Sequence, residues 1–285
     1  DDKAEFSQAG YDDAKWQTVT IPHDWAIYGP FSINNDKQNI AITQDGQKEA
    51  MEHAGRTGGL PFVGVGWYRL DFEAPSFAKG KQATLIFDGA MSHALVYING
   101  QEAGYWPYGY NSFHVDATPY LKPGEMNELA VRLENENESS RWYPGAGLYR
   151  NVHLVVTEDA YVPTWGTHVT TPVVTEKYAK VVLNTKLATA KGADRSAYRI
   201  VTEIKDPNGK VVAKEENKLS VFNECQFEQE FAVATPALWS VENPFLYTAE
   251  SKIYAGNTLK DEYTTRFGIR TLEIIPEKGF FLNGK

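Results

Sequence analysis

Apolar and polar residues alternate with a period of two along most of the chain. Leu129, Val131 and Leu133 are separated by small or polar residues, and Phe227 and Phe231 are separated by glutamates and a glutamine. Successive side chains of a strand point to opposite faces, so this alternation is typical of half-buried antiparallel strands. Only residues 48–53 suggest a turn or two of helix. The pattern therefore predicts an all-β protein.

Turn signals separate the predicted strands. Asn99-Gly100 follows the alternating segment 94–98, and a two-residue type I′ turn requires positive φ at both of its central positions. The segment 206–209 (DPNG) has the same role in the second half. Short strands joined by regular turns are typical of β-sandwiches and jelly rolls.

The chain has 285 residues, which is too long for one ordinary sandwich. Residues 152–157 have the pattern of a closing strand, and residues 158–163 that of a linker. We therefore predict a jelly-roll β-sandwich over residues 1–157. Residues 161–270 have the length of an immunoglobulin-like β-sandwich, although the Cys…Trp…Cys core of antibody domains is missing.

Composition narrows the function classes. Hydrophobic residues make up 42% and charged residues 23%, so each half can bury a core. No apolar run of about 18 residues exists, which predicts no membrane span. The net charge of −9 argues against nucleic acid. Cys225 is the only cysteine, which excludes an intrachain disulfide and a cysteine-built metal site, and its aromatic neighbours indicate a buried thiol rather than a reactive one. A periplasmic or secreted location is expected, with the cytoplasm as the alternative.

The sequence lacks three common motifs: a metal site, a serine triad and a dinucleotide-binding loop. The six histidines are scattered, and none has ligand spacing to another histidine or to the cysteine, so no metal or other cofactor is predicted. His23-Asp24 could begin a catalytic triad, but no serine stands in a G-x-S-x-G elbow. Gly64 and Gly66 lack the third glycine and the following helix of a dinucleotide-binding loop.

Two loops concentrate aromatic residues. Tyr105, Trp106, Tyr108 and Tyr110 lie in the first, together with a proline and a glycine. Aromatic faces stack on the C–H faces of sugars, but such rings also close the ends of a sandwich. For this loop, closing the sandwich is the favoured interpretation.

The second loop places Arg141 before Trp142 and Tyr143, ahead of a Pro-Gly-Ala-Gly turn. An arginine offers planar donors to sugar hydroxyls. The alternative for Arg141 is an ion pair with Glu136 or Glu138 of the same loop, and the residues favour neither interpretation. For the aromatic rings of this loop, stacking on a sugar and closing the end of the sandwich are equally favoured.

The most specific motif is the twelve-residue segment 139–150 (SSRWYPGAGLYR). Other motifs precede and follow it: residues 11–13 (YDD) with Trp16, 21–25 (IPHDW), 66–69 (GWYR), 87–89 (FDG), 96–100 (VYING), 110–113 (YNSF), 238–239 (LW), 243–244 (NP), 246–247 (LY), 266–270 (RFGIR) and 280–285 (FFLNGK). In their joint order, they resemble glycoside hydrolase family 2, the β-galactosidase and β-glucuronidase family, over essentially the whole chain.

This resemblance implies a galactose-binding-like jelly roll, an immunoglobulin-like module, and a hinge at 271–285 into a (β/α)8 barrel. Such a barrel takes about 250 residues and is absent from this chain. In the family it carries both catalytic glutamates, so no catalytic residue is assigned here. The Asn-Glu dipeptides, such as Asn127-Glu128, lack the flanks of a catalytic position.

The resemblance further implies a non-catalytic portion of a retaining enzyme that cleaves terminal β-galactosides. Its expected partner is the sugar, together with the missing barrel, and Arg141 and Trp142 are the expected substrate-binding residues. Parents of β-glucuronidase or β-mannosidase type, or a stand-alone carbohydrate-binding module, are the alternatives. The oligomeric state of the parent, including a homo-oligomer, stays open.

Overall fold

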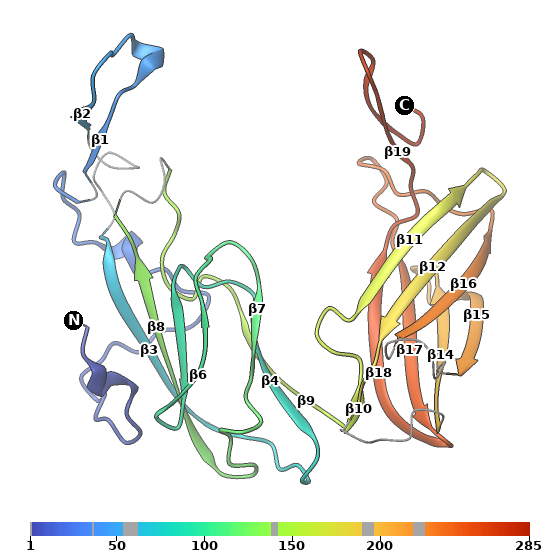
Figure 1. The fold of residues 1–285 in the computed structure, drawn as a ribbon, viewed down its shortest axis with the longest axis horizontal. Helices are drawn as coiled ribbons and strands as arrows, with labels where there is room; N and C mark the ends of the chain where they lie inside the picture. The colour runs from blue at the N-terminus through green and yellow to red at the C-terminus, as the bar shows by residue number, and fades with distance from the viewer. Residues whose placement is uncertain (1, 36, 54–61, 138–141, 190–196, 219–225) are drawn as a thin grey trace. The chain divides into compact units, whose positions relative to one another are not determined.

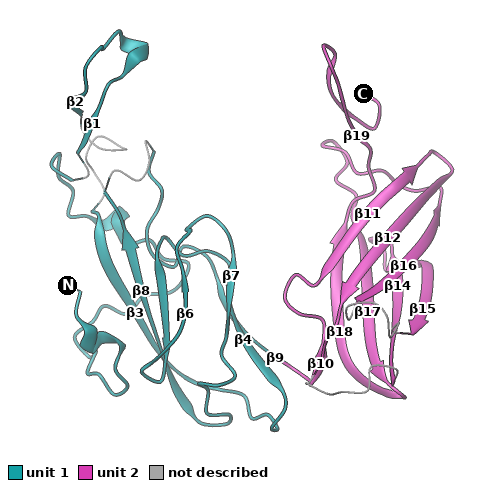
Figure 2. Cartoon of the chain, in the orientation of Figure 1, with its two compact units in different colours: residues 1–156 teal, residues 157–285 magenta. Residues whose placement is uncertain are grey.

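The computed structural model describes residues 2–35, 37–53, 62–137, 142–189, 197–218 and 226–285. The chain divides into two compact units, residues 1–156 and residues 157–285 (Figures 1 and 2). Within the described ranges, the helical elements are short 3-10 turns, η1 (Ala4–Ser7), η2 (Ala26–Tyr28) and η3 (Thr43–Asp45). The prediction of an all-β protein is confirmed.

The first unit is a jelly-roll sandwich of two antiparallel sheets (Figure 1). One sheet has the order β3–β8–β5–β6, with β3 at Gly64–Glu73, β8 at Met126–Asn135, β5 at Ala94–Ile98 and β6 at Gln101–Trp106. The other has the order β7–β4–β9, with β7 at Phe113–Asp116, β4 at Gln82–Phe87 and β9 at Val152–Thr157. Alternate side chains of β4 and β5 are fully buried between the sheets, as the period-two pattern predicts.

The turn between β5 and β6 has the predicted geometry. Asn99 has φ 51° and Gly100 has φ 79°, and the flanking residues Ile98 and Gln101 are paired. The Asn99 side chain also donates hydrogen bonds to the Tyr120 carbonyl and to the Asn127 amide oxygen, both at 2.8 Å. The turn therefore fixes the strand register and ties a neighbouring loop to it.

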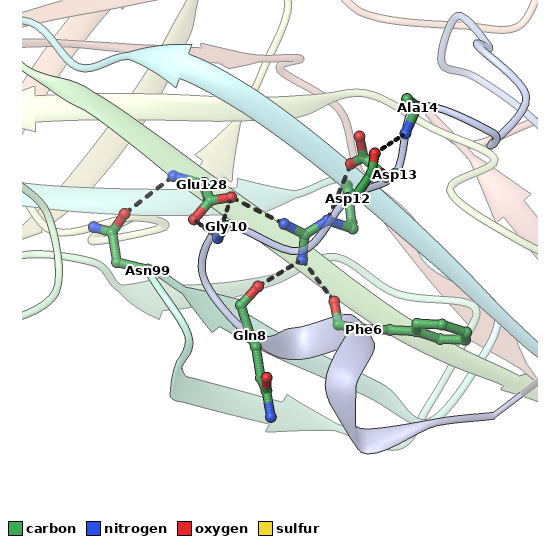
Figure 3. A network of polar contacts seen from close by, with 9 residues as sticks. Phe6, Gln8, Gly10, Asp12, Asp13, Ala14, Asn99 and Glu128 are labelled. Atoms are coloured by element: carbon green, nitrogen blue, oxygen red, sulfur yellow. Dashed lines mark hydrogen bonds and ion pairs between the residues drawn. The ribbon is translucent and has the colours of Figure 1, made fainter.

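One buried arginine fastens the N-terminal segment to the outer face of this sheet. The Arg69 side chain is 3% exposed, and its guanidinium donates to two backbone carbonyls and two carboxylates. Figure 3 shows these acceptors converging: the carbonyls of Phe6 and Gln8 at 2.7 and 3.2 Å, and the carboxylates of Asp13 and Glu128 at 3.1 and 3.0 Å. The Glu128 carboxylate also accepts the Gly10 backbone N–H.

The segment after η2 differs from the helical turn suggested for residues 48–53. Its described part contains a small antiparallel pair, β1 (Gln38–Ile40) with β2 (Met51–His53), in which Gln38 is paired with His53. The suggestion of a helical turn at residues 48–53 was wrong, because residues 51–53 pair as a strand. Cross-strand pairing outweighs the weak local helix preference of so short a segment.

The second unit is an immunoglobulin-like sandwich with sheets of four and three strands. The larger sheet has the order β15–β14–β17–β18, at Val211–Lys218, Tyr198–Lys205, Tyr247–Ala255 and Thr258–Phe267. The smaller has the order β11–β12–β16, at Thr167–Val174, Tyr178–Lys186 and Gln226–Ala234. Two short pairs complete the unit: β10 (Ala160–Tyr161) with β13 (Ala188–Thr189), and β19 (Leu272–Ile275) with β20 (Gly279–Leu282).

Local features of the second unit match the sequence pattern. In the predicted turn, the Asp206 carboxylate accepts the backbone N–H groups of Asn208 and Lys210 at 2.9 and 3.0 Å. Residues 271–285, predicted as a hinge, contain the β19–β20 hairpin.

Cys225 lies outside the described residues. Across the described ranges, no helix is both long enough and apolar enough to cross a membrane.

Candidate functional site

Two motifs that are far apart in the sequence meet at one place in the first unit. The Tyr143 hydroxyl donates a hydrogen bond to Oδ2 of Asp24, 119 residues away. Oδ1 of Asp24 accepts the Ala26 backbone N–H at 2.9 Å. The next residue back, His23, donates its backbone N–H to the Leu148 carbonyl at 2.8 Å. We call the group His23, Asp24, Tyr68, Tyr143 and Gly147 the motif junction.

Close packing explains why glycine stands at position 147 of the junction and at the neighbouring position 66. A Cβ atom on Gly147 would lie 2.3 Å from the Tyr68 hydroxyl and 2.7 Å from the His23 carbonyl oxygen, and its φ of 90° also disfavours any side chain. Gly66 of β3 lies under Trp25, where a Cβ would lie 2.5 Å from the indole ring. These contacts hold His23 so that its Nδ1 is 2.8 Å from the Tyr68 hydroxyl.

Both phenols of the junction remain protonated at neutral pH. Burial raises the pKa of Tyr68 to about 12, and the Asp24 charge adds to the effect. Burial, followed by the hydrogen bond to Asp24, raises the pKa of Tyr143 well above its ordinary value. Tyr143 therefore acts as a fixed donor to Asp24. The half-buried carboxylate has about four acceptor positions, so it can still accept a ligand hydroxyl.

Exposed aromatic rings adjoin the junction. Trp142 is 60% exposed, and its indole N–H donates to the Tyr110 hydroxyl at 2.8 Å. Tyr110 is 40% exposed and its ring centroid lies 5.6 Å from that of Tyr108, which is 56% exposed. The Tyr149 hydroxyl anchors this loop by donating to the Gly109 carbonyl at 2.6 Å. We call Tyr108, Tyr110 and Trp142 the aromatic patch.

The expectation that the first aromatic loop closes the sandwich holds only for Trp106. That ring packs against the core and stacks on Phe113, with centroids 5.9 Å apart. For the tyrosines the expectation was wrong, since Tyr105, Tyr108 and Tyr110 are between 40% and 56% exposed. Tyr105 and Trp106 are consecutive residues of β6, so their side chains point to opposite faces.

The structure describes only one of the two predicted substrate-binding residues. Trp142 lies in the aromatic patch, whereas Arg141 and its alternative partner Glu138 lie outside the described residues. The other alternative partner, Glu136, lies 3.4 Å from Nε2 of His93. A sugar contact by Arg141 therefore stays a prediction.

Sequence reasoning did not single out Asp24 and Tyr143 as a pair. Both lie within motifs, but a separation of 119 residues along the sequence gives no sign that the two side chains are in contact. Where the structure describes the chain, no group of three or more His, Cys, Asp or Glu side chains is arranged to hold a metal ion. The arrangement can hold a polar ligand through a carboxylate beside exposed aromatic faces.

Family comparisons agree with the two-unit architecture. Residues 6–158 match the model described as "Glycosyl hydrolases family 2, sugar binding domain", and residues 161–270 match "Glycosyl hydrolases family 2". The chain belongs to glycosyl hydrolase family 2. Among family 2 relatives, beta-galactosidase BoGH2A of Bacteroides ovatus is 39% identical over 100% of this chain and 32% of its own length. A putative beta-glucuronidase of Formosa agariphila is 34% identical over 100% of this chain and 25% of its own length.

Solved family 2 structures show the same fold. A family 2 member from Bacteroides cellulosilyticus superposes with a TM-score of 0.85 at 34% identity, covering 100% of this chain and 35% of that one. A Bacteroides uniformis beta-glucuronidase gives a TM-score of 0.76 at 26% identity, covering 100% of this chain and 32% of that one. The chain thus spans between about a quarter and two fifths of the length of the relatives it matches.

Proposed function

We propose that this chain is the non-catalytic N-terminal portion of a retaining family 2 glycosidase that acts on terminal β-galactosides. The observation that carries the proposal is the motif junction, where the Asp24 carboxylate lies beside the aromatic patch in the sugar-binding domain. The catalytic carboxylate pair belongs to the remainder of the parent enzyme. The junction and the patch supply one wall of its sugar pocket.

The geometry gives each group a binding role. The Asp24 carboxylate accepts hydrogen bonds from sugar hydroxyls, and the Tyr143 hydroxyl fixes its orientation. The exposed faces of Trp142 and Tyr110 take the C–H face of a sugar ring. Loops held by a rigid sandwich place these groups without changing the scaffold.

The charge of the junction favours a neutral sugar. A β-glucuronide carries a carboxylate, and like charges brought within a few ångströms disfavour each other. Asp24 would oppose such a substrate, whereas galactose hydroxyls donate to it. The 39% identity to a beta-galactosidase supports the same choice, and the 34% identity to a putative beta-glucuronidase supports the alternative.

The substrate is tested with the full-length parent enzyme. Chromogenic β-galactoside and β-glucuronide are compared at equal concentration, and kcat/KM for the galactoside is expected to be at least about tenfold higher, because one unfavourable charge contact of about 1.4 kcal/mol accounts for that ratio. A higher kcat/KM for the glucuronide contradicts the galactosidase proposal and favours the alternative.

Asp24→Asn in the full-length parent tests the binding role of the carboxylate. We expect kcat/KM to fall about tenfold or more, as for the loss of a hydrogen bond to a charged group worth about 1.5–3 kcal/mol. The melting temperature should change little, because the asparagine oxygen still accepts the Ala26 N–H and its amide N–H donates to the Tyr143 hydroxyl oxygen. Steady-state kinetics and thermal unfolding measure the two effects.

The matched control is Asp206→Asn, which alters a carboxylate that accepts two backbone N–H groups in the second unit. It should leave the kinetics unchanged. Tyr143→Phe should lower kcat/KM less than Asp24→Asn does, since it removes only the group that orients the carboxylate. Wild-type kinetics in a folded Asp24→Asn enzyme contradict a sugar contact.

A further inference from the structure

Three asparagine–glycine pairs occur in the sequence, and each stands in a turn of the structure. They are Asn99-Gly100, Asn208-Gly209 and Asn283-Gly284, and all three glycines have positive φ. Asparagine is a thermally labile residue, because its side-chain amide can be converted to a carboxylate with loss of ammonia. A following glycine favours this deamidation, since a residue without Cβ lets its backbone nitrogen approach the side-chain carbonyl carbon closely. The surroundings of each pair decide how easily that approach occurs.

The Asn99 amide is held on both sides. Its nitrogen donates two hydrogen bonds of 2.8 Å, and its oxygen accepts the Glu128 backbone N–H at 3.1 Å. The next residue is closely packed as well, because a Cβ on Gly100 would lie 3.1 Å from the Ala9 backbone nitrogen. Reaction at this pair therefore requires the loss of three hydrogen bonds and the opening of the turn between β5 and β6.

The Asn283 amide is held by two backbone groups. Its oxygen accepts the Thr271 N–H, and its nitrogen donates to the Trp239 carbonyl, both at 3.0 Å. The amide cannot turn toward the next backbone nitrogen without losing these bonds. They lie at the open end of the two-stranded β19–β20 hairpin, which opens more easily than a larger sheet. We therefore expect protection at this pair to be weaker than at Asn99.

Asn208 differs from both. The residue is exposed, and within the described part of the chain no group is hydrogen-bonded to its side-chain amide. A Cβ on Gly209 would meet no atom within 4 Å apart from its chain neighbours, so the space beside the glycine nitrogen is open. The Gly209 N–H donates to the Asp206 carbonyl at 2.9 Å, and this bond must break before the nitrogen can react. In an exposed turn such a local opening costs little free energy.

We propose that Asn208 is the site at which this protein deamidates first, and that the isoaspartate formed there loosens the β14–β15 turn. In the reaction, the Gly209 backbone nitrogen loses its proton and attacks Cγ of Asn208. A new C–N bond closes a cyclic succinimide, the bond from Cγ to Nδ2 breaks, and ammonia leaves carrying the proton. Water then adds to either carbonyl of the ring and opens it to aspartate or isoaspartate. Water is the only other reactant, and either product adds one carboxylate to the turn.

The isoaspartate product changes the backbone as well as the charge. Its main chain runs through the side-chain carbon, so the turn gains a CH2 group. In the unmodified turn, the Asp206 carboxylate accepts the backbone N–H groups of both Asn208 and Lys210, and the longer chain no longer fits this spacing. Strand β15 is the end strand of its sheet and is hydrogen-bonded to β14 along one edge (Figure 1). It is therefore the strand that loosens.

The test incubates the folded chain of residues 1–285 in mildly alkaline buffer, below its melting temperature. Peptide mapping by mass spectrometry follows the replacement of the amide by a carboxyl group at each pair, and labelling by isoaspartyl methyltransferase identifies isoaspartate. Asn208 should react at least about tenfold faster than Asn99, since an opening cost of about 1.4 kcal/mol accounts for that ratio. Asn283 should lie between them. The same chain unfolded in urea is the control, in which the three pairs should react at similar rates.

Two variants separate the chemistry from its consequence. Gly209→Ala should slow the reaction at Asn208 about tenfold or more, because the added Cβ obstructs the approach. The strain of alanine at the φ of 80° would loosen the turn and act in the opposite direction, so slowing identifies the role of the missing Cβ. Asn208→Asp has the charge of the product with an ordinary backbone. Compared with this variant, the purified isoaspartate form should show hydrogen exchange at least about tenfold faster in β15, with β17 unchanged as the internal control.

Reaction at Asn99 or Asn283 as fast as at Asn208 in the folded chain overturns the proposal. So does an Asn208 that stays intact in the folded chain over the time in which the unfolded chain reacts there. Equal exchange of β15 in the isoaspartate form and in Asn208→Asp overturns the loosening of the turn.

Discussion

The isolated chain of 285 residues is expected to turn over a chromogenic β-galactoside about a millionfold more slowly than the full-length parent, that is, at the level of the blank. Retaining glycoside hydrolysis needs a nucleophile and an acid/base carboxylate about 5–5.5 Å apart on either side of the scissile bond. Without them, no covalent intermediate forms and the leaving oxygen is not protonated. We therefore expect the proposed sugar-pocket wall of the first unit to bind the sugar without cleaving it.

The assay uses equal molar amounts of the isolated chain and the parent, with β-galactoside and β-glucuronide substrates in parallel. Far-ultraviolet circular dichroism of the β type confirms that the isolated chain is folded. Turnover within a hundredfold of the parent by a homogeneous preparation would place the catalytic carboxylates in this chain and contradict the proposed division of roles.

Arg69→Met is expected to lower the free energy of unfolding of the first unit by about 3 kcal/mol. The side chain of Arg69 is 3% exposed, and removing it leaves two carboxylates and two carbonyls without their donor. The expected loss lies at the lower end for a broken buried pair, since the side chains of Asp13 and Glu128 are 44% and 25% exposed and recover some hydration.

Denaturant unfolding monitored by hydrogen exchange resolves the two units, with β8 reporting on the first and β17 on the second. The β17 amides should keep their stability in Arg69→Met. Arg199→Met is the matched control: its partner Glu216 is 57% exposed, and exposed pairs contribute less than about 1 kcal/mol. Equal small losses in both variants would mean that the N-terminal segment does not depend on the buried guanidinium.

The sequence by itself predicted the elements whose causes are local. Alternation of Leu129, Val131 and Leu133 predicted the strand that became β8, because strand side chains alternate between core and solvent. Asn99-Gly100 predicted its turn, because few other residues tolerate positive φ at both positions. The ordered motifs identified the family and with it the two sandwich types. The weak helical expectation at residues 48–53 failed because strand pairing there is not a local property.

The candidate sugar site depends on contacts between residues that are distant in the sequence, and the sequence pattern does not predict such contacts. Asp24 and Tyr143 are 119 residues apart and meet only because the fold brings their two loops together. Tyr105 and Trp106 are both aromatic, but Tyr105 is exposed whereas Trp106 packs against the core. The pairing of β6 with β5 decides which face of the strand points toward the core.

Sequence alone determined the strands, the turns and the family, because period, φ preference and motif order are properties of neighbouring residues. Only the tertiary structure decided which residues share a surface. It joined Asp24 to Tyr143, buried Arg69 and left Leu70 uncovered on a core-facing position. The physical reason is that burial and hydrogen-bond partners come from segments distant in sequence, and these are set when the sheets pack.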